Sequence, residues 1–205
     1  MTHDVYVFGS ICRGESGPTS DVDVLVIPFG NESAQFPGSW SVYSRELIQE
    51  YYSKGRLFAW HLHLEAKCVF SSDELPFLTK LGSPAPYSTM NNDIDDLESL
   101  LQQALFELNN GTKNVIYELG IAYTALRDLA MSASWALLGA PCFSSDAPYR
   151  LPINFPLPLT TYKKAMLARH SSTRGTEFDF DFDPVVEDII QAPLVQWVES
   201  LRVPK

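Results

Sequence analysis

The fold of this chain is decided near its start, by residues 5–28, VYVFGSICRGESGPTSDVDVLVIP. The apolar run Val5–Phe8 predicts a buried strand. It ends at Gly9, where a residue without a side chain lets the backbone turn sharply and present its N–H groups. A helix that starts after Ser10 would favour a phosphate at its N-terminus, and Arg13 would add a positive charge there.

Two aspartates follow in the same stretch. Asp21 and Asp23 stand two residues apart, and residues 22–28 alternate in the manner of a strand. We therefore expect both carboxylates to point to one face of that strand. Hard oxygen ligands placed in this way suit Mg²⁺ that carries a nucleoside triphosphate. The stretch thus combines a phosphate cradle with a pair of carboxylates for a metal ion.

In this order and spacing the residues resemble the nucleotidyltransferase superfamily of the DNA polymerase β type. The pattern of that superfamily is Gly-Ser, a short helical turn, Arg-Gly or Gly-Gly, and then Ser-Asp-x-Asp followed by apolar residues. The matching positions are Gly9, Ser10, Arg13, Gly14, Ser20, Asp21 and Asp23. The variant with Arg-Gly looks most like the minimal and the aminoglycoside-type nucleotidyltransferases, and the resemblance covers about the first third of the chain.

The resemblance implies a magnesium-dependent enzyme that transfers a nucleoside monophosphate to an acceptor hydroxyl and releases pyrophosphate. ATP is the expected donor. Nucleotide binding is expected of four residues: Gly9, Ser10, Arg13 and Ser20. Asp21 and Asp23 are the expected ligands of one or two Mg²⁺ ions and take part in catalysis.

A third carboxylate is expected on residues 57–70, whose alternation of apolar and polar side chains predicts a long strand. In the resembling family a carboxylate on a later strand completes the metal site or deprotonates the acceptor hydroxyl. Glu65, on the polar face of the predicted strand, is the candidate for both roles. His61 and His63 share that face, either as phosphate or base contacts or as surface residues. The rivals of Glu65 stand in the next loop: Asp73 and Glu74.

The rest of the chain predicts an α+β fold, with an N-terminal mixed β-sheet flanked by helices and a mostly α-helical C-terminal bundle. Helical spacing of apolar residues indicates helices over 44–54, 94–108, 114–138, 162–168 and 184–201, the last of them disturbed at Pro193. The segment 82–87, which contains two prolines, is typical of a linker. We therefore predict a catalytic domain over 1–85 and a helical domain over 88–205 that binds the acceptor or an interaction partner.

Composition narrows the choice of partners. The 205 residues carry a net charge of −10, which argues against broad, sequence-independent binding of nucleic acid. No apolar run approaches the roughly 20 residues that cross a bilayer, and no signal-peptide pattern opens the chain, so we expect a cytoplasmic protein. The three cysteines, Cys12, Cys68 and Cys142, are far apart, which favours reduced thiols.

Three functions remain open at this point. The first is a nucleotidyltransferase whose acceptor is a small, cationic, aminoglycoside-like molecule. The second is a nucleotidyltransferase that modifies a protein hydroxyl or an RNA end in a toxin–antitoxin or defence system. The third alternative is a non-catalytic, antitoxin-like binding module, against which the intact Asp21-Val22-Asp23 argues. Many members of the family place a helix ahead of the first strand, whereas this strand begins by Val5. The cleft would then be open or completed by a second copy, and we expect a homodimer on that ground alone.

Overall fold

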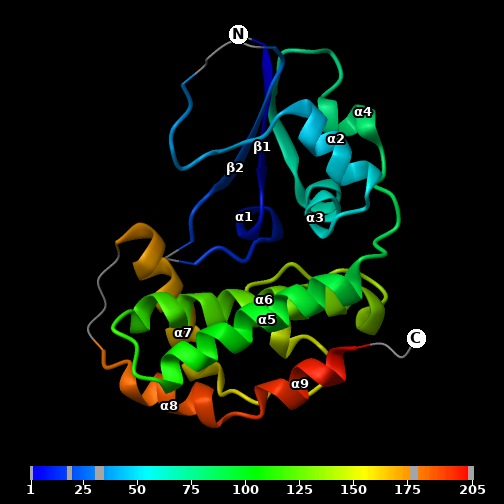
Figure 1. Cartoon of the computed structure of the whole chain (residues 1–205). Helices are drawn as coiled ribbons and strands as arrows, with labels where there is room; N and C mark the ends of the chain where they lie inside the picture. The colour runs from blue at the N-terminus through cyan, green and yellow to red at the C-terminus, as the bar shows by residue number, and fades with distance from the viewer. Residues whose placement is uncertain (1, 18–19, 31–34, 176–179, 203–205) are drawn as a thin grey trace. The chain divides into compact units, whose positions relative to one another are not determined.

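The computed structural model describes residues 2–17, 20–30, 35–175 and 180–202, and the chain divides into two compact units, residues 1–89 and 90–205 (Figure 1). The first unit contains β1 (His3–Phe8), α1 (Ser10–Arg13), β2 (Asp23–Pro28), β3 (Ser41–Val42), α2 (Arg45–Ser53), α3 (Leu57–Glu65), β4 (Lys67–Ser71) and α4 (Phe77–Leu81). The second contains α5 (Met90–Asn109), α6 (Val115–Leu138), the short 3-10 helix η1 (Ala147–Tyr149), α7 (Leu159–Arg174), α8 (Asp183–Gln191) and α9 (Leu194–Leu201).

The described strands of the first unit form one mixed sheet in the order β3-β2-β1-β4. Strand β1 runs antiparallel to both β2 and β4, whereas β3 runs parallel to β2. In the register of β1 and β2, Phe8 lies opposite Asp23. The last residue before Gly9 and the second aspartate of the motif are therefore neighbours across the sheet.

The two faces of the sheet bury different residues, as the period of two along each strand requires. Tyr6, Phe8, Leu25 and Ile27 point to one face, where they pack under α2, α3 and α4 (Figure 1). Val5, Val24 and Val26 point to the other, against Phe36 and Trp40 of the loop before β3. The two predicted strands are confirmed, and the predicted helix over 44–54 is α2, with the Ser44 side chain accepting a hydrogen bond from Leu47 N.

The prediction of one long strand over 57–70 is wrong in its first part. Residues 57–65 form helix α3, and only Lys67–Ser71 are a strand. The buried positions of α3 are Ala59 and Leu62, one helical turn apart, whereas Leu64, on the apolar face of the predicted strand, is 53% exposed. An alternating pattern concealed a helical stripe, because Trp60 and Leu64 are apolar without belonging to the core.

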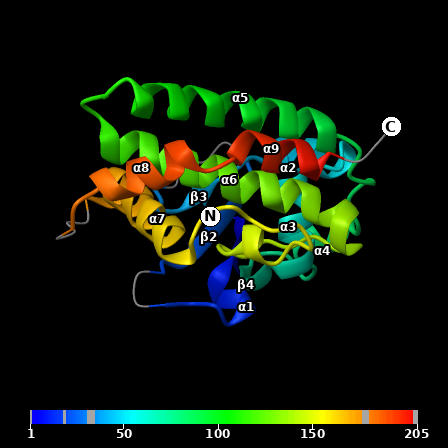
Figure 2. The ribbon, with the colours of Figure 1, turned by 90° about the horizontal axis from the view of Figure 1, so that it is seen from below.

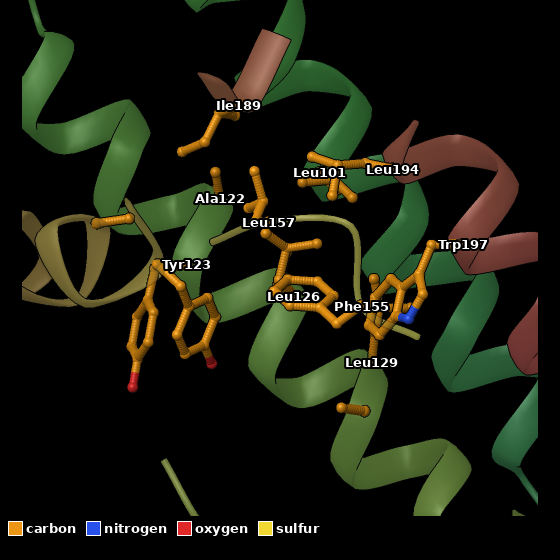
Figure 3. Close-up of a cluster of buried hydrophobic side chains, with 14 of the residues drawn as sticks. Leu101, Ala122, Tyr123, Leu126, Leu129, Phe155, Leu157, Ile189, Leu194 and Trp197 are labelled. Carbon is orange, nitrogen blue, oxygen red and sulfur yellow. The ribbon is translucent and has the colours of Figure 1, made fainter. Parts of the chain in front are cut away.

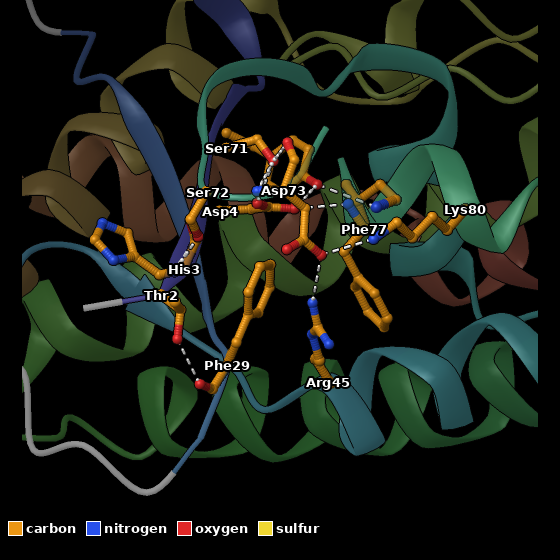
Figure 4. A network of polar contacts seen from close by, with 12 residues as sticks. Thr2, His3, Asp4, Phe29, Arg45, Ser71, Ser72, Asp73, Phe77 and Lys80 are labelled. Carbon is orange, nitrogen blue, oxygen red and sulfur yellow. Dashed lines mark hydrogen bonds and ion pairs between the residues drawn. The ribbon is translucent and has the colours of Figure 1, made fainter. Parts of the chain in front are cut away.

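A fully buried carboxylate ties β1 to β4 and α4 (Figure 4). Asp4 accepts hydrogen bonds from Tyr6 Oη at 2.9 Å, from Ser71 Oγ at 2.7 Å and from the backbone N–H of Phe77 at 2.6 Å. The Phe77 N–H is one of the donors that the start of a helix leaves without a partner inside the helix. Asp4 therefore holds the N-terminus of α4 against the sheet, and burial raises the pKa of the neighbouring Tyr6 hydroxyl well above its usual value.

The second unit is helical, with α6 packed against both α5 and α7 (Figure 2). Helix α6 is buried along most of its length, and its side chains meet those of α5, α9 and the segment before α7 in one core (Figure 3). At Gly120 a Cβ atom would lie 2.9 Å from the Cα of Arg169, so glycine permits the close approach of α7. The predicted helix over 184–201 is two helices, divided at Pro193.

The α+β class, with an N-terminal sheet and a helical C-terminal region, is confirmed. Among the described residues, no helix has both the length and the apolar character needed to span a membrane.

Candidate functional site

The site starts at the turn that follows β1. Gly9 has φ 76° and ψ −149°, a conformation that side chains exclude, and Gly14 ends α1 in the left-handed region. Both Cys12 N and Arg13 N donate to Gly9 O, at 3.0 and 3.3 Å. The helix expected after Ser10 is thus a single turn of four residues.

Gly9 also makes room for one of the aspartates. A Cβ atom on Gly9 would lie 2.2 Å from Asp23 Oδ2, well inside contact distance. The Asp23 side chain therefore lies against the turn itself, in the space that any other residue at position 9 would fill. The pairing of Phe8 with Asp23 across the sheet explains this proximity.

Asp21 differs from Asp23 in its setting. Strand β2 begins at Asp23, so Asp21 precedes the strand, and it is exposed. The expectation that both aspartates lie on one strand is met by Asp23 alone. Within residues 2–17, 20–30, 35–175 and 180–202, no group of three or more His, Cys, Asp or Glu side chains is gathered closely enough to hold a metal ion.

Glu65 reaches the turn from a helix. It is the last residue of α3, and its Oε2 accepts a hydrogen bond from Arg13 Nη1 at 2.5 Å. The two side chains are 12% and 19% exposed, so this ion pair is largely shielded from water. Although Glu65 is not on the predicted strand, the structure joins it to the motif, 52 residues away along the chain.

Arg13 has a second carboxylate partner, because its Nε donates to Glu15 Oε2 at 2.8 Å. Burial lowers the pKa of Arg13, but the bonds to Glu15 and Glu65 outweigh burial and raise this pKa above its usual value. A guanidinium group has five N–H donors, and these two bonds use only Nε and Nη1.

The other predicted nucleotide ligands lie in the same region of the chain. Ser10 is the first residue of α1 and is partly exposed. Ser20 is exposed, and its Oγ accepts a hydrogen bond from the N–H of Gly17 at 2.9 Å. The Cys12 thiol donates to Val7 O at 3.4 Å, so it faces the strand rather than the surface of the turn.

The rival carboxylates belong to a different neighbourhood (Figure 4). Asp73 Oδ2 accepts hydrogen bonds from Lys80 Nζ at 2.6 Å and from Arg45 Nη2 at 3.4 Å. The bond from Lys80 is the main cause that lowers the pKa of Asp73. Glu74 is exposed. Of the three candidates, Glu65 is the one that the structure connects to Arg13.

The sequence left His61 open between a phosphate or base contact and a surface residue, and the structure places it against Glu65. His61 Nε2 lies 2.9 Å from Glu65 Oε2, one turn earlier on α3. Spacing of four residues would have signalled this contact had 57–65 been recognised as a helix. His63 is exposed and lies elsewhere on the helix surface.

Part of the chain matches a known protein family. Residues 2–74 match the sequence profile of the nucleotidyltransferase domain. No curated protein sequence matches the chain significantly. Among solved structures, the chain is similar to spectinomycin adenyltransferase AAD(9) from Enterococcus faecialis, in a crystal structure with ATP and spectinomycin. The identity is 14%, the TM-score is 0.48, and the match covers 97% of this chain and 90% of that one.

The profile match includes every part of the site described above. Its span begins before β1, contains the turn at Gly9, both aspartates and Glu65, and ends after β4. Residues 2–74 of this chain are therefore a nucleotidyltransferase domain.

Proposed function

We propose that the protein transfers AMP from ATP to a hydroxyl group of a small acceptor, with Mg²⁺ as its cofactor and pyrophosphate as the second product. One observation carries the proposal, namely the ion pair between Arg13 and Glu65. This ion pair brings Glu65, the third carboxylate, to the turn that begins at Gly9 and lies against Asp23. Phosphate binding, a metal-binding carboxylate and a proton acceptor are thereby available within one unit.

The residues that would hold Mg²⁺ are Asp21 and Asp23, with Glu65 as the third ligand in the sequence prediction. Their carboxylate oxygens are the hard donors that this ion prefers. The tight packing of Asp23 against Gly9 fits such a role, because it holds one carboxylate directly beside the turn. When bound, Mg²⁺ supplies charge stabilisation and orientation for the phosphates.

The remaining chemistry belongs to the side chains and backbone of the turn. Gly9 and Ser10 would orient the β- and γ-phosphates, and Arg13 Nη2 would offset negative charge on the departing pyrophosphate. The acceptor oxygen attacks the α-phosphorus, a new P–O bond forms, and the bond from the α-phosphorus to the bridging oxygen breaks. Glu65 takes the proton of the acceptor hydroxyl in this step.

The acceptor is proposed to be a small cationic, hydroxylated molecule of the aminoglycoside kind. The net charge of −10 favours a cationic partner by long-range attraction and disfavours a polyanion such as RNA. A protein hydroxyl is the remaining alternative, and only a test with acceptors separates the two.

The proposal is tested by incubating the protein and Mg²⁺ with each of the four ribonucleoside triphosphates, labelled in the α-phosphate. A cell lysate divided into small molecules, RNA and protein supplies the acceptors. We expect label from ATP to enter the small-molecule fraction. Asp21→Asn/Asp23→Asn serves as the matched control, because it removes metal ligands but no core volume; it should keep its fold and lose magnesium-dependent ATP binding in calorimetry. Equal magnesium-dependent affinity in the control would remove the proposal.

A further inference from the structure

His61 is bonded to the side chain that we propose as the proton acceptor. Its Nε2 lies 2.9 Å from Glu65 Oε2. A carboxylate offers only acceptors, so the hydrogen of this bond is carried by Nε2. The two residues are four apart on α3, which places them on the same side of the helix.

The ring of His61 is fixed from the side of the sheet. It meets the ring of Phe8 edge-on, with centroids 5.4 Å apart and an interplanar angle of 81°. It also meets Phe58 of the same helix edge-on, and its side chain is 19% exposed. Phe8 is the last residue of β1 and immediately precedes Gly9. The imidazole ring therefore packs against the last residue of β1, directly before the turn at Gly9.

The bonds to Glu65 are distributed unequally over its two oxygens. Arg13 and His61 both bond to Oε2, and within the described residues Oε1 has no hydrogen bond. Rotation of a carboxyl group about its last side-chain bond is soft, so one bond from Arg13 would leave the plane of the carboxyl group free to turn. A second donor on the same oxygen, held by a packed ring, fixes that plane.

We propose that His61 is a positioning residue that fixes the plane of the Glu65 carboxyl group, so that the oxygen bonded to neither Arg13 nor His61 is held toward the acceptor hydroxyl. The inference rests on the proposed function of Glu65 and adds a residue to it. His61 itself touches neither nucleotide nor acceptor in this role.

Two variants separate positioning from packing. His61→Phe keeps a ring against Phe8 and Phe58 but has no donor, whereas His61→Gln keeps a donor four residues before Glu65 but has no ring. With ATP and Mg²⁺ as probes, we expect kcat for pyrophosphate release to fall about tenfold or more in His61→Phe, at unchanged KM and calorimetric Kd for ATP. His61→Gln should stay near the wild-type rate. The reverse order, with His61→Phe active and His61→Gln impaired, would assign His61 to packing and overturn the inference.

A second measurement needs neither nucleotide nor metal. Thermal unfolding of the ligand-free protein is compared for His61→Phe, Glu65→Ala and the double variant. If Nε2 bonds to Glu65, the Tm shifts of the single variants should not add up in the double variant. Additive shifts would overturn the inference. An absence of transfer by the wild-type protein would remove the proposed function and this inference with it, whereas a wild-type rate in His61→Phe removes this inference alone.

Discussion

At the scale of single residues, Gly9 links backbone conformation to chemistry. Its φ and ψ belong to a region that is essentially restricted to glycine, and its missing side chain leaves the space that Asp23 Oδ2 occupies. Gly9→Ala should therefore cost about 1–3 kcal/mol in backbone strain and, in addition, displace the Asp23 carboxylate. We expect magnesium-dependent ATP binding, measured by calorimetry, to be lost in this variant even at temperatures where it is folded.

Gly14→Ala is the matched control for this prediction. Gly14 also has positive φ, at 70°, but nothing lies within 4 Å of a Cβ atom placed there. Gly14→Ala should strain the backbone without displacing the Asp23 carboxylate, so the Tm falls while the affinity for ATP stays at the wild-type value. If both variants bound ATP equally well, Asp23 would not be a ligand that depends on the turn.

Glu65 offers a second test at the residue scale. Because Asp21 and Asp23 would still hold the metal–nucleotide, Glu65→Gln should bind ATP with nearly normal affinity. Transfer, or slow hydrolysis of ATP to AMP and pyrophosphate, should fall by roughly 100-fold, the usual scale for the loss of a positioned proton acceptor. Asp73→Asn is the control, since Asp73 is bonded to Lys80 and Arg45 instead. Wild-type rates in Glu65→Gln with losses in Asp73→Asn would move the third carboxylate into the loop after β4.

At the scale of elements, the sequence predicted β1, the turn, β2 and α2 because each has its own local signal. An apolar run followed by glycine, an alternating pattern after two aspartates, and the helical spacing of apolar residues over 44–54 are all short-range features. Residues 57–65 carry a weaker signal, since their apolar residues alternate and the helical pair Ala59 and Leu62 is hidden among them. The burial of Ala59 and Leu62 under the sheet favours a helix over a strand here, and this packing is not visible in the local sequence.

Glu65 was predicted to lie near the motif although residues 57–65 were predicted as a strand and form a helix. The prediction needed a carboxylate on a later strand of the same sheet, and Glu65 lies two residues before β4. Its contact with Arg13 spans 52 residues and has no counterpart in any local pattern. The same holds for His61, whose spacing to Glu65 has meaning only on a helix.

Helix α4 shows a long-range contact of the same kind, and it can be tested. Asp4→Ala would leave the Phe77 N–H and two hydroxyl groups without their acceptor, at about 1–3 kcal/mol for each buried group. We expect the free energy of unfolding in urea to fall by about 3 kcal/mol or more. Asp4→Asn should cost only about 1 kcal/mol, because its oxygen still accepts and its amide can donate to Ser71 Oγ. Equal stability of Asp4→Ala and the wild-type protein would show that Asp4 does not anchor α4.

At the scale of the whole molecule, the sequence predicted a sheet-containing part followed by helices, and each unit has its own core. The predicted linker is more ordered than its prolines suggest. Ala85 N donates to Tyr52 O at 2.9 Å, and Trp60 Nε1 donates to Ala85 O at 3.0 Å. The segment is thus bonded to the first unit. Neither Tyr52 nor Trp60 is near this segment in sequence, so composition alone could not reveal these bonds.

Because the two units have separate cores, a cavity made in one core should weaken that unit and leave the other intact. Leu126 of α6 is fully buried in the core of the second unit, and Leu62 of α3 is 1% exposed in the core of the first. Each Leu→Ala change should destabilise its own unit by about 2–5 kcal/mol, as expected for a buried leucine that leaves a cavity. The two variants have the same chemistry and differ only in which core they weaken.

Their effects on ATP binding should therefore differ. Leu62→Ala loosens the helix that carries Glu65 and His61, so we expect weaker transfer together with a lower Tm. Leu126→Ala should lower stability, measured by calorimetric or urea unfolding, while magnesium-dependent ATP affinity at 15 °C, about the temperature of greatest stability, stays at the wild-type value. A loss of ATP affinity in Leu126→Ala while the protein remains folded would contradict the assignment of the nucleotide site to residues 1–89 alone.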